Sequence, residues 1–155
     1  MQPLQFFDAN ALSGSRHDPQ MQPRPAQGYA GDVTPQLAWE WVQSGAALLV
    51  DVRTDAEREW VGFVPGALPL AWKQWPGMVP NAGFDAGLQS AAAQGKPLLL
   101  LCRSGVRSVA AARRATELGA CAYNILEGFE GDPDGNAHRG GQGGWRFHGL
   151  PWRQN

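Results

Sequence analysis

The spacing of three apolar runs along the chain constrains its fold more than any other feature. The runs cover residues 47–52, 98–101 and 122–126, each is of strand length, and polar residues hardly interrupt them. Such continuity predicts strands that are buried on both faces, as in a parallel sheet. Segments with helical signals lie between the runs, and this alternation predicts an α/β fold. Right-handed crossovers then bring the loops after the strands to one edge of the sheet.

The predicted helices begin and end at residues with a clear local reason. Thr34 is placed to cap a helix whose first residue is Pro35, and Gly45 can end that helix. Further helices are predicted at residues 55–61, 84–93 and 108–118, and a further strand at 67–70.

The chain of 155 residues fits one domain with a sizeable core. Residues 1–28 are rich in Gln and Pro, so we expect a flexible N-terminal tail there and the domain at residues 29–155. Residues 127–144 contain seven Gly among 18 positions, which predicts a long irregular loop.

Charge and cysteine content exclude several classes of protein. A net charge of −1 gives no reason to expect a nucleic-acid or membrane partner, and no signal peptide or membrane-length apolar run is visible. Two cysteines do not make a disulfide-stapled scaffold, and His138 and His148 lack metal-ligand spacing with either of them. We therefore expect a cytoplasmic protein with no metal and no cofactor.

The segment that follows the second apolar run carries the chemistry. Cys102 ends that strand, and the predicted helix begins six residues later; the loop comprises Arg103, Ser104, Gly105, Val106, Arg107 and Ser108. Backbone N–H groups at such a strand-to-helix turn form an anion cradle at the positive end of the helix dipole. Gly105 permits a backbone conformation that a side chain would resist, and the arginines favour an anion. The loop therefore favours a Cys102 thiolate, the nucleophile of sulfur exchange.

Several short motifs together resemble the single-domain type of the rhodanese-like sulfurtransferases over residues 29–152. They are Val50-Asp51-Val52-Arg53, Glu57 six residues after Asp51, Pro65-Gly66-Ala67, the loop from Cys102 to Arg107, and Gly149-Leu150-Pro151. The resemblance implies one domain with a mostly parallel central sheet of about five strands and helices on both faces. It also implies a persulfide on Cys102, loaded from thiosulfate or another sulfane-sulfur donor and unloaded to cyanide, a thiol or a protein acceptor.

The chain departs from that family pattern at two places. Phe63 stands where family members usually have His, and one extra residue precedes Gly62. The glycine-rich stretch at 127–144 replaces a short helix that most members have. The first departure loses a structural polar group, and the second affects acceptor recognition more than the cysteine chemistry.

Other polar and aromatic residues have a structural and a functional interpretation. Asp51, Arg53 and Glu57 are predicted to form supporting ion pairs, with a role in the pocket as the alternative. Cys121 is predicted to be a small core residue at the far end of the helix from Cys102. The segment 72–75, with a Trp at each end, either packs on the core or borders the pocket.

Two other functions share parts of this pattern. Cysteine phosphatases and arsenate reductases have five residues between Cys and Arg, whereas four separate Cys102 from Arg107, and the smaller ring suits a single sulfur atom better than a tetrahedral oxyanion. A non-catalytic binding or regulatory module is a further alternative, although inactive relatives typically lose the cysteine.

The glycine-rich stretch has a predicted position. The segments that leave the strands ending near Leu126 and Leu101 emerge at the same edge of a parallel sheet. Residues 130–144 are therefore predicted to lie over or beside the Cys102 pocket.

Overall fold

The computed structural model describes residues 18–155, and at its centre lies a five-stranded parallel sheet. All its pairings are parallel, and the strand order is β1-β7-β6-β2-β3. The strands are β1 (Gly31–Val33), β2 (Leu48–Asp51), β3 (Leu68–Pro69), β6 (Leu98–Leu101) and β7 (Ala122–Ile125). The predicted fold class, an α/β domain with about five mostly parallel strands, is confirmed.

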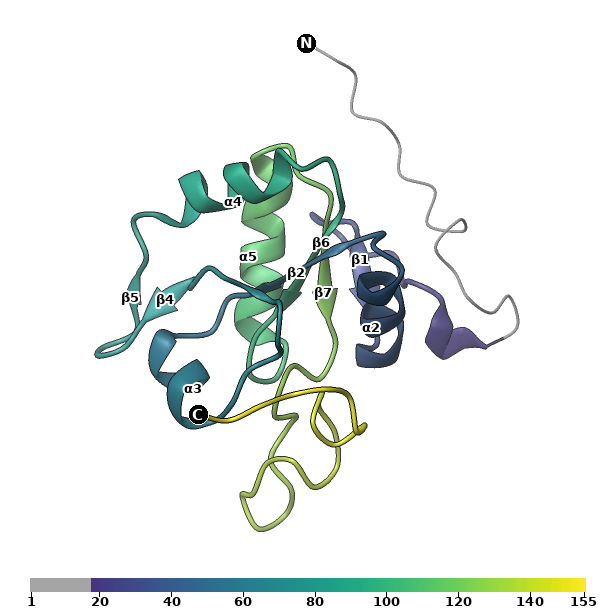
Figure 1. Cartoon of the computed structure of the whole chain (residues 1–155), viewed down its shortest axis with the longest axis vertical. Helices are drawn as coiled ribbons and strands as arrows, with labels where there is room; N and C mark the ends of the chain where they lie inside the picture. Colours follow the sequence, from purple (N-terminus) through teal and green to yellow (C-terminus); the bar gives the residue numbers. More distant parts are fainter. Residues whose placement is uncertain (1–17) are drawn as a thin grey trace.

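Helices cover both faces of this sheet (Figure 1). Helix α2 lies on one face, and α4 and α5 lie on the other. The helices are α2 (Pro35–Gln43), α3 (Asp55–Trp60), α4 (Phe84–Ala92) and α5 (Val106–Glu117). Within residues 18–155, no helix is both long enough and apolar enough to cross a membrane.

Successive residues of the central strand β6 point into two separate cores. Leu99 and Leu101 pack with Trp41 of α2, whereas Leu98 and Leu100 pack with Leu88 of α4 and the alanines of α5. All four leucines are fully buried. This burial on both faces is the reason that the strand appears in the sequence as an uninterrupted apolar run.

Helix α5 begins earlier than the sequence predicts. Its first residue is Val106, and Gly105 occupies the N-cap position with φ of 109° and no side-chain cap. The prediction of a start at Ser108 was wrong because Ser favours helix starts, whereas a Gly N-cap leaves no side-chain signal. The helix consequently begins four residues after Cys102, which tightens the loop between them.

Three short strands were not predicted. Strand β1 contains only three residues and pairs at the sheet edge with β7. Strands β4 (Lys73–Gln74) and β5 (Val79–Pro80) form a separate antiparallel hairpin. These three strands have two or three residues each, too few for a hydrophobic period to reveal them.

A flexible tail was predicted for residues 1–28. Residues 1–17 lie outside the described residues, so for them it stays a prediction. Within residues 18–28, a short 3-10 helix η1 (Pro19–Met21) contacts α2, and Met21 packs on the core. The backbone of Arg24 pairs with that of Asp32 in β1.

The glycine-rich segment lies beside the cysteine loop, as predicted. No helix or strand interrupts residues 127–144. Backbone N–H groups of Phe129 and Glu130 donate to the carbonyls of Cys102 and Arg103 at 2.8 and 2.9 Å. The buried Trp145 holds the far end of the segment by a backbone bond to Gly128. In Figure 1 this segment, α3 and the first turn of α5 lie at the same end of the molecule.

Candidate active site

Cys102 directly follows β6 and lies at the base of the loop that leads into α5. Only 1% of the residue is exposed. The Gly105 backbone N–H donates to Sγ at 3.1 Å, and the Ser108 hydroxyl lies 3.1 Å from the same atom. A backbone donor at the positive end of a helix dipole and a hydroxyl are therefore both placed to interact with this sulfur.

Arg107 of the loop is fixed by Glu57 from α3. Its two terminal nitrogens donate to the two oxygens of Glu57 at 2.6 and 2.8 Å, which is a bidentate pair. Burial alone would raise the pKa of Glu57, but its bonds with Arg107 and with Thr54 hold that pKa below its ordinary value. The hydrogen bond with Glu57 raises the pKa of Arg107 despite burial, with a smaller electrostatic contribution from Cys102.

Glu57 is itself held by the start of its own helix. Thr54 and Glu57 form a capping box, in which the Thr54 hydroxyl accepts from the Glu57 backbone N–H and Oε1 of Glu57 accepts from the Thr54 backbone N–H. The sequence predicted Glu57 as a supporting residue, and the structure also places it on the wall of the pocket.

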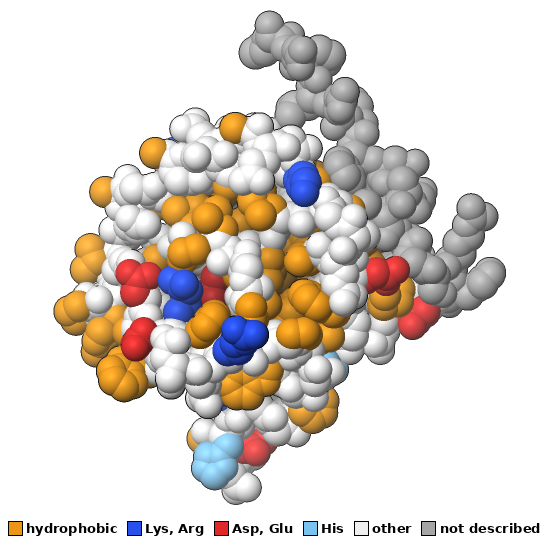
Figure 2. Space-filling model, in the orientation of Figure 1, with side chains coloured by type: hydrophobic (Ala, Val, Ile, Leu, Met, Phe, Trp, Pro, Cys, Tyr) orange, Lys and Arg blue, Asp and Glu red, His pale blue; other side chains and the backbone are white. Residues whose placement is uncertain are grey.

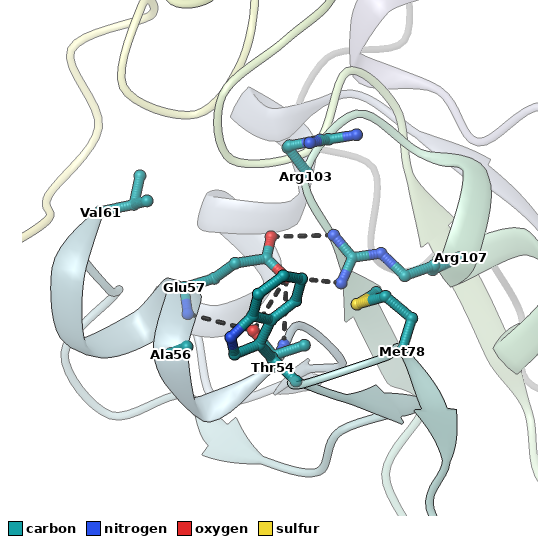
Figure 3. A pocket seen from close by; sticks show the side chains of 8 residues that line it. Thr54, Ala56, Glu57, Val61, Met78, Arg103 and Arg107 are labelled. Carbon is teal, nitrogen blue, oxygen red and sulfur yellow. Dashed lines mark hydrogen bonds and ion pairs between the residues drawn. The ribbon is translucent and has the colours of Figure 1, made fainter.

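A cavity of about 430 Å³ opens beside the loop (Figure 3). Figure 3 shows Glu57 of α3 and Arg107 of α5 joined by their two hydrogen bonds among the residues that line it. Three of its eight lining residues are charged, one is neutral and polar, and four are apolar: Thr54, Ala56, Glu57, Val61, Trp75, Met78, Arg103 and Arg107. Cys102, of which only 1% is exposed, is not among the residues that line this cavity.

Arg103 is the exposed cation of this site. It lines the first cavity and also a second one of about 620 Å³. The second cavity shares Glu57 and Val61 and is completed by residues of the glycine-rich segment: Glu130, Ala137, His138 and Arg139. Within residues 18–155 no ion pair is formed by Arg103, so its charge is available to an anionic ligand.

Exposed hydrophobic side chains adjoin the first cavity. Trp75 lines it and is 65% exposed, and Val79 of the same hairpin is also exposed. Figure 2 shows hydrophobic side chains gathered at the edge of the molecule over the β4–β5 hairpin and α3. Trp75 thus borders the pocket, whereas Trp72 packs on Phe84 in the core.

The remaining loop and support residues occupy different positions. Val106 points to solvent with 78% of its surface exposed, and Ser104 is half-buried. Asp51 and Arg53 form a fully buried pair at 2.7 Å and line neither cavity. Arg53 also donates to the Gly62 carbonyl and lies 4.2 Å from the Phe129 ring centre. This position fits the predicted supporting role.

Sequence reasoning missed a polar chain behind the sulfur. The Ser108 hydroxyl donates to Asn124 Oδ1 at 2.5 Å, and Asn124 Nδ2 donates to Asp32 Oδ1 at 2.9 Å. The one available signal was a polar Asn within the apolar run of β7.

Cys121 lies in a different environment from Cys102. It stands beyond the C-terminal end of α5, partly buried against the core, and burial raises the pKa of its thiol. Within residues 18–155 no group of three or more His, Cys, Asp or Glu side chains is placed to hold a metal ion.

Comparison with known proteins places this geometry among related domains. Residues 34–131 match the family described as "Rhodanese-like domain". The chain is 31% identical over 121 residues to "Thiosulfate sulfurtransferase GlpE" of Actinobacillus succinogenes, covering 77% of this chain and 87% of that protein. The crystal structure of Rv0390 from M. tuberculosis is 43% identical with a TM-score of 0.74, covering 82% of this chain and 99% of that one. A rhodanese-like domain protein from Staphylococcus aureus, 24% identical, shares the fold with a TM-score of 0.50 over 63% of this chain and 85% of that one.

Proposed function

The chain belongs to the rhodanese-like family, and on that premise we propose that it is a sulfurtransferase that carries sulfur as a persulfide on Cys102. One observation carries the proposal: the Cys102 sulfur accepts the Gly105 N–H at the N-terminus of α5, in a loop closed by Arg107. A thiolate is favoured where backbone N–H groups and cations surround it.

The proposed reaction has two displacements at the transferred sulfur. In the first, the Cys102 thiolate attacks the outer sulfur of thiosulfate, the S–S bond of the donor breaks, and sulfite leaves with the electron pair. In the second, an acceptor such as cyanide attacks the outer persulfide sulfur, thiocyanate leaves, and the Cys102 thiolate is regenerated. A thiol or a protein cysteine can replace cyanide as acceptor.

The surrounding charges fit an anionic donor and an anionic intermediate. We propose that Arg103 attracts the donor, because its guanidinium lines both cavities and lies next to Cys102 in the chain. Arg107 is rigid because Glu57 holds it by two bonds, so its positive charge stays near the loop. In this proposal Asp51, Arg53 and Glu57 support the loop, and Ser104, Gly105, Val106 and Ser108 shape it.

Phosphatase chemistry is the second candidate among Cys–loop–Arg enzymes. The four-residue spacing from Cys102 to Arg107 disfavours it, because the small ring leaves little space for a tetrahedral oxyanion. A purely regulatory module is disfavoured because the cysteine and its hydrogen bonds are present.

Mass spectrometry of the thiosulfate-treated protein tests the proposal. We expect one added sulfur, about 32 Da, on the peptide that contains Cys102 and none on Cys121, whose buried thiol has a raised pKa. Cys102→Ser should abolish both the mass gain and thiocyanate formation, whereas the matched variant Cys121→Ser should retain them. Hydrolysis of aryl phosphates that disappears in Cys102→Ser would replace this proposal with the phosphatase one.

A further inference from the structure

The polar chain behind Cys102 has a fixed hydrogen-bond direction. The Asp32 carboxylate only accepts, so the amide nitrogen of Asn124 must face it, at 2.9 Å. The amide oxygen of Asn124 then faces Ser108, at 2.5 Å, and it too can only accept. The single hydroxyl hydrogen of Ser108 is therefore directed to Asn124.

This direction determines what Ser108 presents to the sulfur. With its hydrogen committed to Asn124, the Ser108 oxygen turns a lone pair toward Cys102 Sγ at 3.1 Å. A lone pair accepts from a thiol S–H but repels a thiolate. Ser108 and Asn124 are 0% and 2% exposed, so water does not compensate for the missing donor.

We propose that Asn124, oriented by Asp32, is a positioning residue that controls the protonation of Cys102 through the Ser108 hydroxyl. A resting Cys102 thiol is compatible with these hydrogen bonds, because its S–H donates to Ser108. A persulfide also fits, because its charge lies on the outer sulfur. A free thiolate fits only when the hydroxyl turns to the sulfur and leaves the buried Asn124 oxygen unpaired. These hydrogen-bonded side chains thus disfavour the free Cys102 thiolate relative to the thiol and the persulfide.

Asp32, at the end of this series of hydrogen bonds, is also held by Tyr29. The Tyr29 hydroxyl donates to the same Asp32 oxygen at 2.8 Å, and burial together with this bond raises the pKa of Tyr29. Asp32 therefore receives donors from both sides, which holds its carboxylate in position against Asn124. The orientation of Asn124 is in this way fixed from strand β1.

Other charged groups also influence the sulfur. Arg107 comes from α5 and is paired with Glu57 of α3, and Arg103 comes from the loop. Asp51, the last residue of β2, is paired with Arg53 just after that strand. Variants at Ser108 and Asn124 leave all of these charges in place. A change in thiol ionisation in such variants therefore reports the hydroxyl and not the surrounding field.

The inference rests on the proposed role of Cys102, but its test does not require sulfur transfer. The rate of iodoacetamide alkylation of Cys102, followed by peptide mass, is measured against pH. The pH midpoint of this rate reports ionisation, whereas the plateau reports access to the buried sulfur.

Asn124→Leu keeps the side-chain size and frees the Ser108 hydroxyl to donate to the thiolate. We expect the alkylation midpoint to fall by about one pH unit, with about tenfold faster alkylation at lower pH. Ser108→Ala removes the hydroxyl, and Ser108→Ala/Asn124→Leu should have the same midpoint as Ser108→Ala alone. Near-UV circular dichroism confirms that each variant is folded.

Asp32→Asn is the second variant, at a half-buried position, in case Asn124→Leu does not fold. Its amide allows Asn124 to turn over, so the midpoint should fall here as well. If Asp32→Asn acted only by removing a negative charge, it would lower the midpoint by the same amount with Ser108 present and in the Ser108→Ala background. The proposed effect requires the Ser108 hydroxyl and should be absent in that background. An unchanged midpoint in both Asn124→Leu and Asp32→Asn, or equal shifts with and without Ser108, would overturn the inference.

Discussion

The packing of Gly128 against the cysteine loop gives a sharp test of how the loop is held. An ideal Cβ at position 128 would lie 2.4 Å from the carbonyl carbon of Arg103 and 2.5 Å from the Ser104 nitrogen. These are backbone atoms, so no flexible side chain can move aside. In Gly128→Ala either the segment that begins at Glu127 or the loop after Cys102 must shift.

The size of the effect follows from these distances. An ordinary contact begins at about 3.4 Å, so the two backbones must separate by about 1 Å. A misplacement of that size at a reacting group lowers kcat by about 100-fold. Gly128 also has a φ of 65°, where an Ala side chain costs a further 1–2 kcal/mol or so.

A matched variant separates the two contributions. Gly45 has a φ of 77° and nothing within 4 Å of its Cβ position, and it precedes β2 at the opposite edge of the sheet. Gly45→Ala should therefore lose stability by about 1–2 kcal/mol, a Tm decrease of several degrees, with kcat unchanged.

The assay is thiocyanate formation from thiosulfate and cyanide, with Tm measured on the same preparations. We expect Gly128→Ala to lose kcat far beyond what its Tm explains. If its kcat stays within about twofold of Gly45→Ala, contact between the glycine-rich segment and the loop does not position Cys102, and the reasoning is refuted.

Four further outcomes are expected. Glu57→Gln should release Arg107 and lower kcat by about tenfold, with its rescue by Glu57→Asp tested in the same assay. In the folded protein the pKa of Glu57 lies below its ordinary value of 4.5, so Glu57 stabilises the fold above that pH and this stabilisation is lost as the pH falls further. Below about pH 4.5 the Tm of Glu57→Gln should therefore vary less with pH than the Tm of the unmodified protein. Equal slopes of Tm against pH in the two proteins would contradict this. Arg103→Ala should raise KM for thiosulfate severalfold, without making that KM depend more steeply on salt concentration. An unchanged KM would show that Arg103 does not bind the donor. Shortening residues 132–142 should raise KM for a bulky thiol more than for cyanide, and equal losses in a folded variant would indicate a structural role.

The architecture could be predicted because its signals are local and redundant. The four leucines of β6 are apolar without interruption since both sheet faces are covered, and Thr34 and Pro35 mark the start of α2 by their own chemistry. Cys102 was proposed as the reactive residue on a similarly local signal, because a cysteine, a glycine and two arginines lie together in one loop. The start of α5 escaped prediction because Gly105 caps the helix without a side chain.

By itself, the sequence determined the parallel α/β domain and pointed to the proposed nucleophile and its loop, because each depends on residues that are neighbours in the chain. Only the tertiary structure decided which groups act on that loop from elsewhere. Glu57 reaches Arg107 from 50 positions away, and Asp32 reaches Asn124 from 92 positions away. An acid or an amide can pair with many partners, and the sequence does not distinguish among them. The choice is made by the register of β1 against β7 and by the angle at which α3 approaches α5, and both are consequences of packing the whole chain.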